Sequence, residues 1–423
     1  MSTDLNNITV GLVPSGKSNQ YWQVALLGSK AGRKRSIFNN LITWAYWFAF
    51  TQLIFLYSLI LATALTLKRS KIIANGPDAQ QALDCYKLFL DIYPTSVYPL
   101  VVKAMELTFY KHYLLSEPTL ELGTGDGYFT SHLYLSKNSK VTIASDLTGA
   151  TLLQARKYSF WRKLATIDAS QVPLPNNSLS TVIMNNLIHH LPDRNETLKE
   201  MYRILMPGGM FIFTDEFDGW ATSQWHIKAK EGHKSYQQNI SSFLQRGVQC
   251  LLSDKQYWVK QAEANGWEVC DMREFFSNKS MYLSSYLETL NRKMGAPTPK
   301  PIRDILDKLP LLKKMQLSLT KQIAENFITR DFELCQQYGA TSIFVALRKK
   351  GDPESIDVNE PTLVCPACKS ALVLREDGDF CQSCHKAYPR FEDIPFLISY
   401  FEDLPVQDYV DGVKYKPLPD VSC

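Results

Sequence analysis

Three glycines in the stretch 121–127, which reads ELGTGDG, have a spacing that suits the binding of a nucleotide or nucleoside. The apolar run Pro118–Leu122 precedes them and the helix-like YFTSHLYLS follows, which predicts a strand, a tight turn and a helix. A nucleoside must come close to the backbone where strand meets helix, and a Cβ at Gly123 or Gly125 would block that approach. Alternatively, the glycines only make a tight turn.

Two acidic residues end the next predicted strands. Asp146 follows the apolar run 141–145, one predicted helix and one predicted strand after Gly123. An acid in this position accepts hydrogen bonds from both hydroxyls of a ribose. Asp168, with Ala169, ends the short strand 164–167. The competing interpretation is that both acids cap the helices that follow them.

The pattern of strand and helix continues beyond these acids. PLPNNSL at 173–179 leads into a strand at 181–184, and Asn185 comes directly after it. A helix at about 195–205, Pro-Gly-Gly at 207–209 and an apolar strand at 210–213 complete the run. Alternation of this kind predicts an α/β fold with a doubly wound, mostly parallel sheet.

The run 116–215 resembles the class I S-adenosylmethionine-dependent methyltransferases, and in particular their small-molecule and quinone-biosynthesis branch. The resemblance covers about 115–276 and implies a Rossmann-like sheet of seven strands, with S-adenosylmethionine as the cofactor. It implies that Glu121, Gly123 and Gly125 shape the pocket for the methionine end, while Asp146 holds the ribose. Asp168 and Ala169 would flank the adenine, and Asn185 would lie beside the sulfonium.

Two other classes of protein compete with this assignment. NAD-dependent enzymes also use a glycine turn and an acid after the second strand, but their GxGxxG spacing differs because the third glycine here comes one residue early. A scaffold protein that keeps the fold without turnover is the other alternative. The intact glycine turn and Asp146 favour an enzyme.

Methyl transfer from a sulfonium is a direct displacement that needs alignment and, for a protonated acceptor, a base. His189 and His190 follow the fourth predicted strand and are the candidates for catalysis. The alternative is that one packs beneath the sheet and the other begins a helix. Asp215, Glu216 and Asp218 follow the fifth predicted strand and are either further candidates or a solvated loop.

Two helical insertions, at about 217–252 and 277–338, interrupt the predicted methyltransferase domain at 76–350. Thr341–Leu347 resembles the family's final, antiparallel strand. The first insertion is rich in aromatic side chains, which favours a lid over a bulky, apolar acceptor. Tertiary packing would demand the same residues, so both interpretations stay open.

The pairs Cys365–Cys368 and Cys381–Cys384 are separated by twelve residues, a spacing close to that of a four-cysteine zinc ribbon. With four thiolates the zinc would be structural, although His385 could compete as a ligand. The residues after it, YPRFEDIPFL, resemble zinc-ribbon activator subunits of RNA and protein methyltransferases.

Charge divides the 423-residue chain. Residues 1–75 carry eight Lys or Arg against one acid, whereas residues 351–423 carry six bases against fourteen acids. The segment from Ser36 to Leu67 holds no charge and lies between basic clusters, which favours a re-entrant or in-plane membrane segment. Buried helices packed on the catalytic domain are the alternative.

Together these features predict a cytoplasmic methyltransferase, associated with membranes through 36–67, that acts on a hydrophobic small molecule, a lipid or a quinone-like acceptor. Four of the nine cysteines form the CxxC pairs and the other five are scattered, which does not fit a secreted disulfide framework. The acidic ribbon, at 351–423, suits a protein partner better than phosphate. A methyltransferase of RNA or of a translation protein, with a built-in activator, is the second hypothesis.

Overall fold

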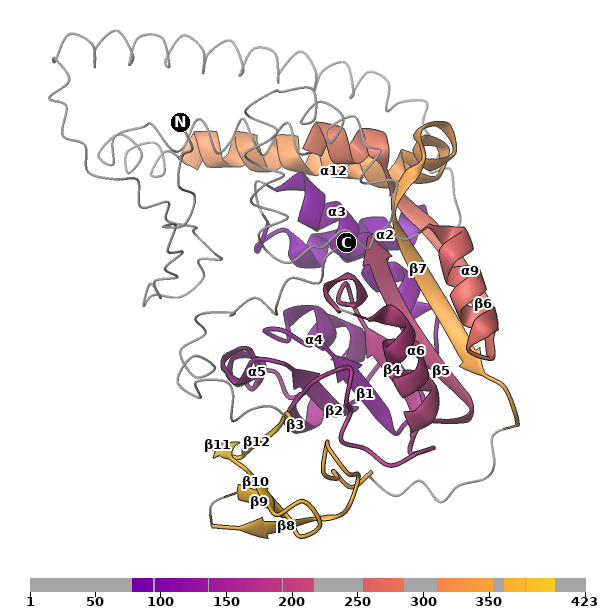
Figure 1. The fold of residues 1–423 in the computed structure, drawn as a ribbon. Helices are drawn as coiled ribbons and strands as arrows, with labels where there is room; N and C mark the ends of the chain where they lie inside the picture. The colour runs from indigo at the N-terminus through magenta and orange to yellow at the C-terminus, as the bar shows by residue number, and fades with distance from the viewer. Residues whose placement is uncertain are drawn as a thin grey trace, which may run out of the picture.

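The computed structural model of this protein describes most of the chain between residues 78 and 399 and contains one large sheet covered by helices (Figure 1). The described residues are 78–93, 96–135, 137–191, 193–216, 254–284, 310–352, 361–376 and 378–399. The predictions for 1–75 and 217–252 lie outside these ranges, and so does the middle of the insertion at 277–338.

The large sheet has the strand order β11-β12-β3-β2-β1-β4-β5-β7-β6. Its strands are β1 (Thr119–Leu122), β2 (Val141–Asp146), β3 (Trp161–Ile167), β4 (Leu179–Met184), β5 (Leu205–Glu216), β6 (Trp267–Ser277), β7 (Ala340–Lys349), β11 (Arg390–Phe391) and β12 (Ile394–Leu397). Neighbours from β12 to β5 are parallel, and β7 is antiparallel to both β5 and β6. The predicted doubly wound α/β fold and the antiparallel final strand are confirmed.

The seven predicted strands are present as β1 to β7, and the described C-terminal segment adds two further strands to this sheet. Phe396 pairs with Thr166 and Leu397 with Ile167, so β12 extends the sheet beyond β3 in the parallel direction. Asp215 and Glu216, predicted to follow the fifth strand, lie inside β5 instead. They pair with Ile343 and Ser342 of the antiparallel β7, which prolongs β5 past its apolar part.

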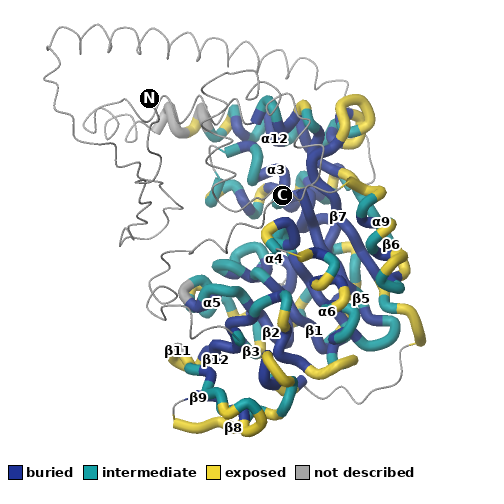
Figure 2. Tube along the Cα trace, in the orientation of Figure 1, coloured by how far each residue is buried: buried dark blue, intermediate teal, exposed yellow. Residues whose placement is uncertain are grey.

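Both faces of the sheet are buried, as a parallel sheet between two helical layers requires (Figure 2). On β4, Val182 and Met184 pack into one core and Ile183 into the other. On β5, Phe211 and Phe213 face the first of these cores, and Ile212 faces the second. The two-residue repeat of strands therefore divides the apolar residues between two helical layers.

The helices form two layers, one on each face of the sheet. The described helical segments are α2 (Ala79–Tyr86), η1 (Lys87–Phe89), α3 (Val97–Lys111), α4 (Tyr128–Leu135), α5 (Gly149–Ala155), η2 (Ile188–His190), α6 (Arg194–Ile204), α9 (Lys255–Ala264) and α12 (Pro310–Tyr338). One layer contains α3, α4 and α12, and the other contains α6 and α9. Pro310 begins α12, where a missing N–H is tolerated.

The helix α6 begins where its sequence predicts. Asp193 is the N-cap, and its side chain accepts hydrogen bonds from the backbone N–H groups of Asn195 and Glu196. Leu198 and Met201 are three residues apart and both are buried against the sheet. Among the helices in the described ranges, none combines the length and the apolar character needed to cross a bilayer.

The C-terminal module, residues 361–399, folds as a small sheet that is joined to the large one. Its antiparallel strands are β8 (Leu372–Arg375), β9 (Gly378–Cys381) and β10 (Lys386–Tyr388). Phe396 of β12 packs so closely on Gly149 that a Cβ there would lie 2.8 Å from the phenyl Cζ. Arg156, the residue after α5, pairs with both Glu392 and Asp393.

We expect Phe396→Ala to lower the free energy of unfolding by about 3 kcal/mol, because the ring is 3% exposed and its removal leaves a cavity over Gly149. Urea denaturation of the full chain measures this change. The matched control is Phe332→Ala, since Phe332 is 60% exposed and should cost far less. Equal effects of the two substitutions would contradict the docking of β12.

Candidate active site

The glycine turn after β1 has backbone angles that favour glycine. Gly123 has φ +75° and Gly125 has φ +59°, both in the left-handed region. A Cβ at Gly123 would lie 2.9 Å from the Leu187 side chain, whereas one at Gly125 would meet nothing within 4 Å. The absence of a side chain at Gly123 therefore lets Leu187 pack against the turn. The space beside Gly125, in contrast, is open.

Asp146 at the end of β2 holds this turn in place. Its Oδ2 accepts a hydrogen bond from the Gly125 N–H at 3.0 Å. Its Oδ1 accepts from both the N–H (2.9 Å) and the hydroxyl (2.8 Å) of Thr148, the residue before α5. The carboxylate thus orders the turn before α5, but it does not cap the helix, because the N-cap is Thr148 and receives no side-chain cap hydrogen bond. Two oxygens with about four acceptor positions leave capacity for a further donor.

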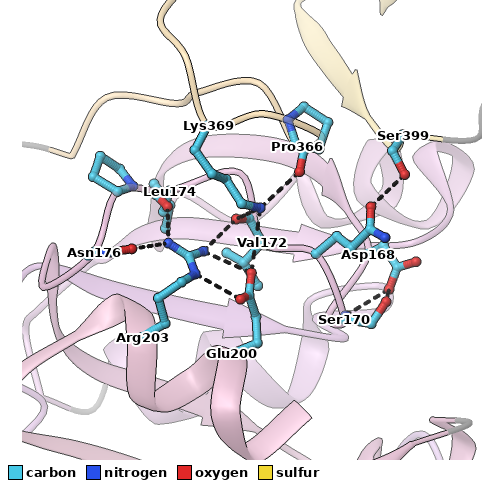
Figure 3. A network of polar contacts seen from close by, with 12 residues as sticks. Asp168, Ser170, Val172, Leu174, Asn176, Glu200, Arg203, Pro366, Lys369 and Ser399 are labelled. Carbon is cyan, nitrogen blue, oxygen red and sulfur yellow. Dashed lines mark hydrogen bonds and ion pairs between the residues drawn. The ribbon is translucent and has the colours of Figure 1, made fainter. Parts of the chain in front are cut away.

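Asp168 and Ala169 begin a loop that polar contacts fasten to the rest of the protein (Figure 3). Asp168 Oδ1 accepts from the Ser170 N–H and hydroxyl at 2.8 and 2.7 Å, and Ala169 is buried. Arg203 of α6 donates to the carbonyl oxygens of Val172 (3.0 Å) and Leu174 (2.8 Å). The structure therefore fixes the loop at the carboxyl end of β3.

The C-terminal module holds the same loop from the other side (Figure 3). Lys369 Nζ donates to the Val172 carbonyl at 3.1 Å and lies 3.7 Å from Glu200 of α6. The Ser399 hydroxyl donates to Gln171 Oε1 at 2.5 Å. The module thus contacts the residues directly after Asp168 and Ala169.

Asn185 at the end of β4 belongs to a polar cluster with α3. With its amide oriented to satisfy both ends, its nitrogen donates to Glu106 Oε2 at 3.2 Å and its oxygen accepts from Lys103 Nζ at 3.0 Å. Lys103 and Glu106 also form an ion pair at 2.8 Å, and the Thr214 hydroxyl donates to Glu106 Oε1 at 3.2 Å. Asn185 is therefore held in one orientation by charged neighbours.

Glu121 lies on β1 with its carboxyl group inside the protein, 1% exposed. The Thr130 hydroxyl donates to its Oε1, while Oε2 has no hydrogen-bond partner in the described part of the chain. Burial raises the pKa of Glu121 to about 8, although Thr130 and Lys103 act to lower it. Such a carboxyl group favours a nearby positive charge.

The two histidines occupy different surroundings. His189 is 3% exposed, and its Nδ1 lies 3.3 Å from Asp215 Oδ1, while His190 is exposed. Burial alone would lower the pKa of His189, but Asp215 and Glu216 outweigh it and raise that pKa. Trp258 Nε1 donates to Asp215 Oδ2 at 3.2 Å, so this network is on the α9 side of β5. The catalytic role of both histidines stays a prediction.

Sequence reasoning missed Tyr98, Lys103 and Glu106, which α3 places over the carboxyl ends of β4 and β5. One signal was available. The helix reads VYPLVVKAMELTFYK, in which a lysine and a glutamate three residues apart interrupt an otherwise apolar pattern. Charges within a helix that has to be buried must be paired, and such pairs often belong to a functional site.

The four cysteines of the CxxC pairs come together as predicted. Their sulfur atoms all lie within 4.8 Å of one another, at 3.9 Å for Cys365 and Cys384 and 3.5 Å for Cys368 and Cys381. A tetrahedral zinc ion with bonds of about 2.3 Å places its thiolates about 3.8 Å apart. The set fits zinc, and within the described ranges it contains cysteine alone, without His385.

We expect the double substitution of Cys365→Ser and Cys381→Ser to reduce bound zinc from about one per chain to none, because each pair loses a thiolate. Metal analysis of the purified full chain measures the content. Cys270→Ser is the control, since Cys270 is exposed on β6 outside the cluster. Zinc content that is unchanged in the double variant would contradict the metal site.

Comparison with known proteins finds similarity to methyltransferases. Residues 120–213 match the family model described as "Methyltransferase domain". A malonyl-[acyl-carrier protein] O-methyltransferase of Legionella pneumophila is 31% identical over 98 residues, which are 22% of this chain and 34% of the relative. The ubiquinone/menaquinone biosynthesis C-methyltransferase of Rickettsia bellii is 32% identical over 111 residues, covering 23% and 44%.

The solved structure of a Haloferax volcanii complex between a methyltransferase activator and a methyltransferase matches with 15% identity and a TM-score of 0.36, covering 65% of this chain and 98% of that one. The chain spans less than half the length of the two curated relatives, 34% and 44%. Residues 120–213 of this chain form a methyltransferase domain with a Rossmann-like, mostly parallel sheet.

Proposed function

We propose that this protein transfers a methyl group from S-adenosylmethionine to a hydrophobic small molecule, such as a lipid or a quinone-like compound. One observation carries the proposal: the Gly125 turn, Asp146 and Asp168 follow three neighbouring parallel strands and lie at one edge of the sheet. Ligands of open α/β sheets bind at this edge, where the direction of winding reverses between β1 and β4.

The residues present fit the cofactor. The open side of Gly125 and the spare acceptor capacity of Asp146 suit a ribose, and the loop at Asp168 and Ala169 suits the adenine. The orphaned Oε2 of Glu121 suits the methionine ammonium, and Asn185 would lie beside the sulfonium. Once bound, the cofactor supplies an electrophilic methyl group and a neutral thioether as the leaving group.

The proposed acceptor follows from the relatives' names and from the surface near Asn185. By their names, one relative methylates a malonyl-[acyl-carrier protein] and another acts in quinone biosynthesis. In this chain, the Tyr98 ring packs edge to face on Phe276 at 5.2 Å, and Lys103 lies 5.2 Å from the centre of the Phe129 ring. Aromatic side chains therefore pack beside the Asn185 cluster, as we expect near the site of a hydrophobic acceptor.

The C-terminal module supports the same proposal as a brace for the cofactor site. It contacts Gly149, three residues after Asp146, and Val172, four residues after Asp168. Its negative charge, six bases against fourteen acids in 351–423, disfavours contact with the phosphates of RNA. The residues 36–67 lie outside the described ranges, and their membrane role stays a prediction.

We expect the purified chain to bind S-adenosylmethionine in calorimetry and to move its labelled methyl group into the lipid-extractable fraction of a cell lysate. Asp146→Ala should weaken binding by roughly 10- to 100-fold, because it removes hydrogen bonds to a charged acceptor. Asp193→Asn, at the N-cap of α6 and outside the proposed cofactor contacts, should bind normally. Absence of binding, or label in nucleic acid or protein instead, would overturn the proposal.

The pH dependence of binding gives a second test. Below pH 8 the Glu121 carboxyl holds a proton that a cationic ligand must displace, so affinity for S-adenosylmethionine should rise by up to about tenfold per pH unit from pH ~6 and level off above about 8. Calorimetry in two buffers of different ionisation enthalpy should detect the released proton. Glu121→Gln should remove this release and the exposed Glu196→Gln should keep it; equal behaviour would count against the assignment.

A further inference from the structure

Glu216 is a buried carboxyl group that the proposed cofactor contacts do not use. It is the last residue of β5 and is 3% exposed. Because strand residues alternate between faces, Glu216 lies on the same face as Thr214, which contacts Asn185. Glu216 therefore lies one step beyond the Asn185 cluster, toward the carboxyl edge of the sheet where an acceptor must enter.

In the described part of the chain, one of the two carboxyl oxygens of Glu216 accepts a hydrogen bond. The Tyr98 hydroxyl donates to its Oε1 at 2.8 Å, whereas its Oε2 has no hydrogen-bond partner in the part of the chain that the structure describes. Ser342, which pairs with Glu216 across β5 and β7, is 3% exposed, and its hydroxyl oxygen is also unpartnered in these residues. Paired strand residues lie on one face, so two unsatisfied polar groups are neighbours.

A comparison with Asp331 shows that this arrangement is not the usual one for a structural acid in this protein. Asp331, 2% exposed, accepts from the backbone N–H groups of Phe276 at 2.9 Å and Ser277 at 3.2 Å, one on each oxygen. Buried acids that serve the fold are satisfied in this way. An acid that is open on one oxygen has the capacity to bind or to take up a proton.

The surroundings of Glu216 contain charges of both signs. Burial raises the pKa of Glu216, and the nearby Asp215 and Glu106 raise it further. His189 and the Tyr98 hydroxyl lower it. The group therefore exchanges a proton closer to neutral pH than an exposed glutamate does, as a general base requires.

We infer that Glu216 is the base that takes the proton from the methyl acceptor, and that the acceptor is a molecule whose nucleophilic oxygen or nitrogen carries a hydrogen. This inference rests on the proposed function. It assigns Tyr98 as the residue that positions the Glu216 carboxylate, with Ser342 as a neighbouring hydrogen-bonding group. The Tyr98 ring packs edge to face on the buried Phe276 ring, which helps to hold the Tyr98 hydroxyl in place.

The chemistry of the step balances. The acceptor's oxygen or nitrogen forms a bond to the methyl carbon while the carbon–sulfur bond breaks, and the electron pair of that bond stays on sulfur. The acceptor's hydrogen moves as a proton to Glu216 Oε2, which becomes a neutral carboxylic acid. The positive sulfonium and the negative carboxylate are both neutralised, and a buried site of low dielectric constant favours loss of separated charge.

The test compares the full chain with Glu216→Gln, using [13C-methyl]S-adenosylmethionine and an organic extract of a cell lysate as the acceptor pool. Glu216→Gln should reduce the transfer rate by about 10²–10⁴-fold while the calorimetric affinity for S-adenosylmethionine stays unchanged. The 13C spectrum of the product should show the methyl carbon on oxygen or nitrogen. The exposed Glu268→Gln on β6 should transfer normally.

The pH profile distinguishes a base from a structural residue. In the wild-type chain the transfer rate should fall as pH drops through the pKa of Glu216, which gives the pH–rate profile an acidic limb. Glu216→Gln should lose this limb. Tyr98→Phe should shift the limb to higher pH, because it removes a hydrogen bond that lowers this pKa. In the protein without ligands, infrared titration should show a carboxylic acid band that disappears in Glu216→Gln.

Two results would overturn the inference while leaving the proposed function intact. One is a Glu216→Gln variant that transfers methyl groups within threefold of the wild-type rate. The other is a product methylated on carbon or on a nitrogen that carried no hydrogen. A wild-type chain that neither binds S-adenosylmethionine nor transfers its methyl group overturns the proposed function, and the inference with it.

Discussion

The parallel pairing of β1 between β2 and β4 is the constraint on which the rest of the structure depends. Leu122 pairs with Ser145 on one side and with Met184 on the other, so all three strands end at the same level. Thr119 and Thr142 strengthen this register, because each hydroxyl accepts a hydrogen bond from the other's backbone N–H at 2.9 Å. The glycine turn, Asp146 and Asn185 are neighbours for this reason alone, although β2, β3 and β4 lie between the first and the last in the sequence.

Local patterns in the sequence predicted what local physics determines. The glycine turn, the helix predicted at about 195–205 and the two cysteine pairs each depend on residues close together in the chain, and the structure has each where it was expected. The strand β12 could not be predicted in this way. It is short, and its partner β3 belongs to the first half of the chain, with most of the methyltransferase domain between them. Nothing local to Ile394–Leu397 indicates so distant a parallel partner, since the pairing depends on how the module docks.

The end of β5 is a second place where the local sequence did not predict the structure. Thr214, Asp215 and Glu216 look like the start of a solvated loop, because polar residues usually end a strand. The structure continues β5 through them, because the antiparallel β7 supplies hydrogen bonds as far as Ser342. Once inside the sheet, the acids must be buried on alternate faces, and each needs its own partners. Asp215 has Trp258 and His189 on the α9 side, and Glu216 has Tyr98 on the α3 side.

This division of acids between two faces gives the two carboxyl groups different neighbours. Asp215 is fully buried, with an indole donor, the imidazole of His189 and the guanidinium of Arg194 at 3.8 Å around it. Positive charge is thereby concentrated on the α9 face. On the other face Lys103 is paired with Glu106, and its attraction lowers the pKa of Glu121 by less than burial raises it. The protein therefore keeps these two acids short of positive charge in its interior. Under the proposed function, a cationic cofactor beside Glu121 and a proton from the acceptor at Glu216 would be the two additions that restore the balance.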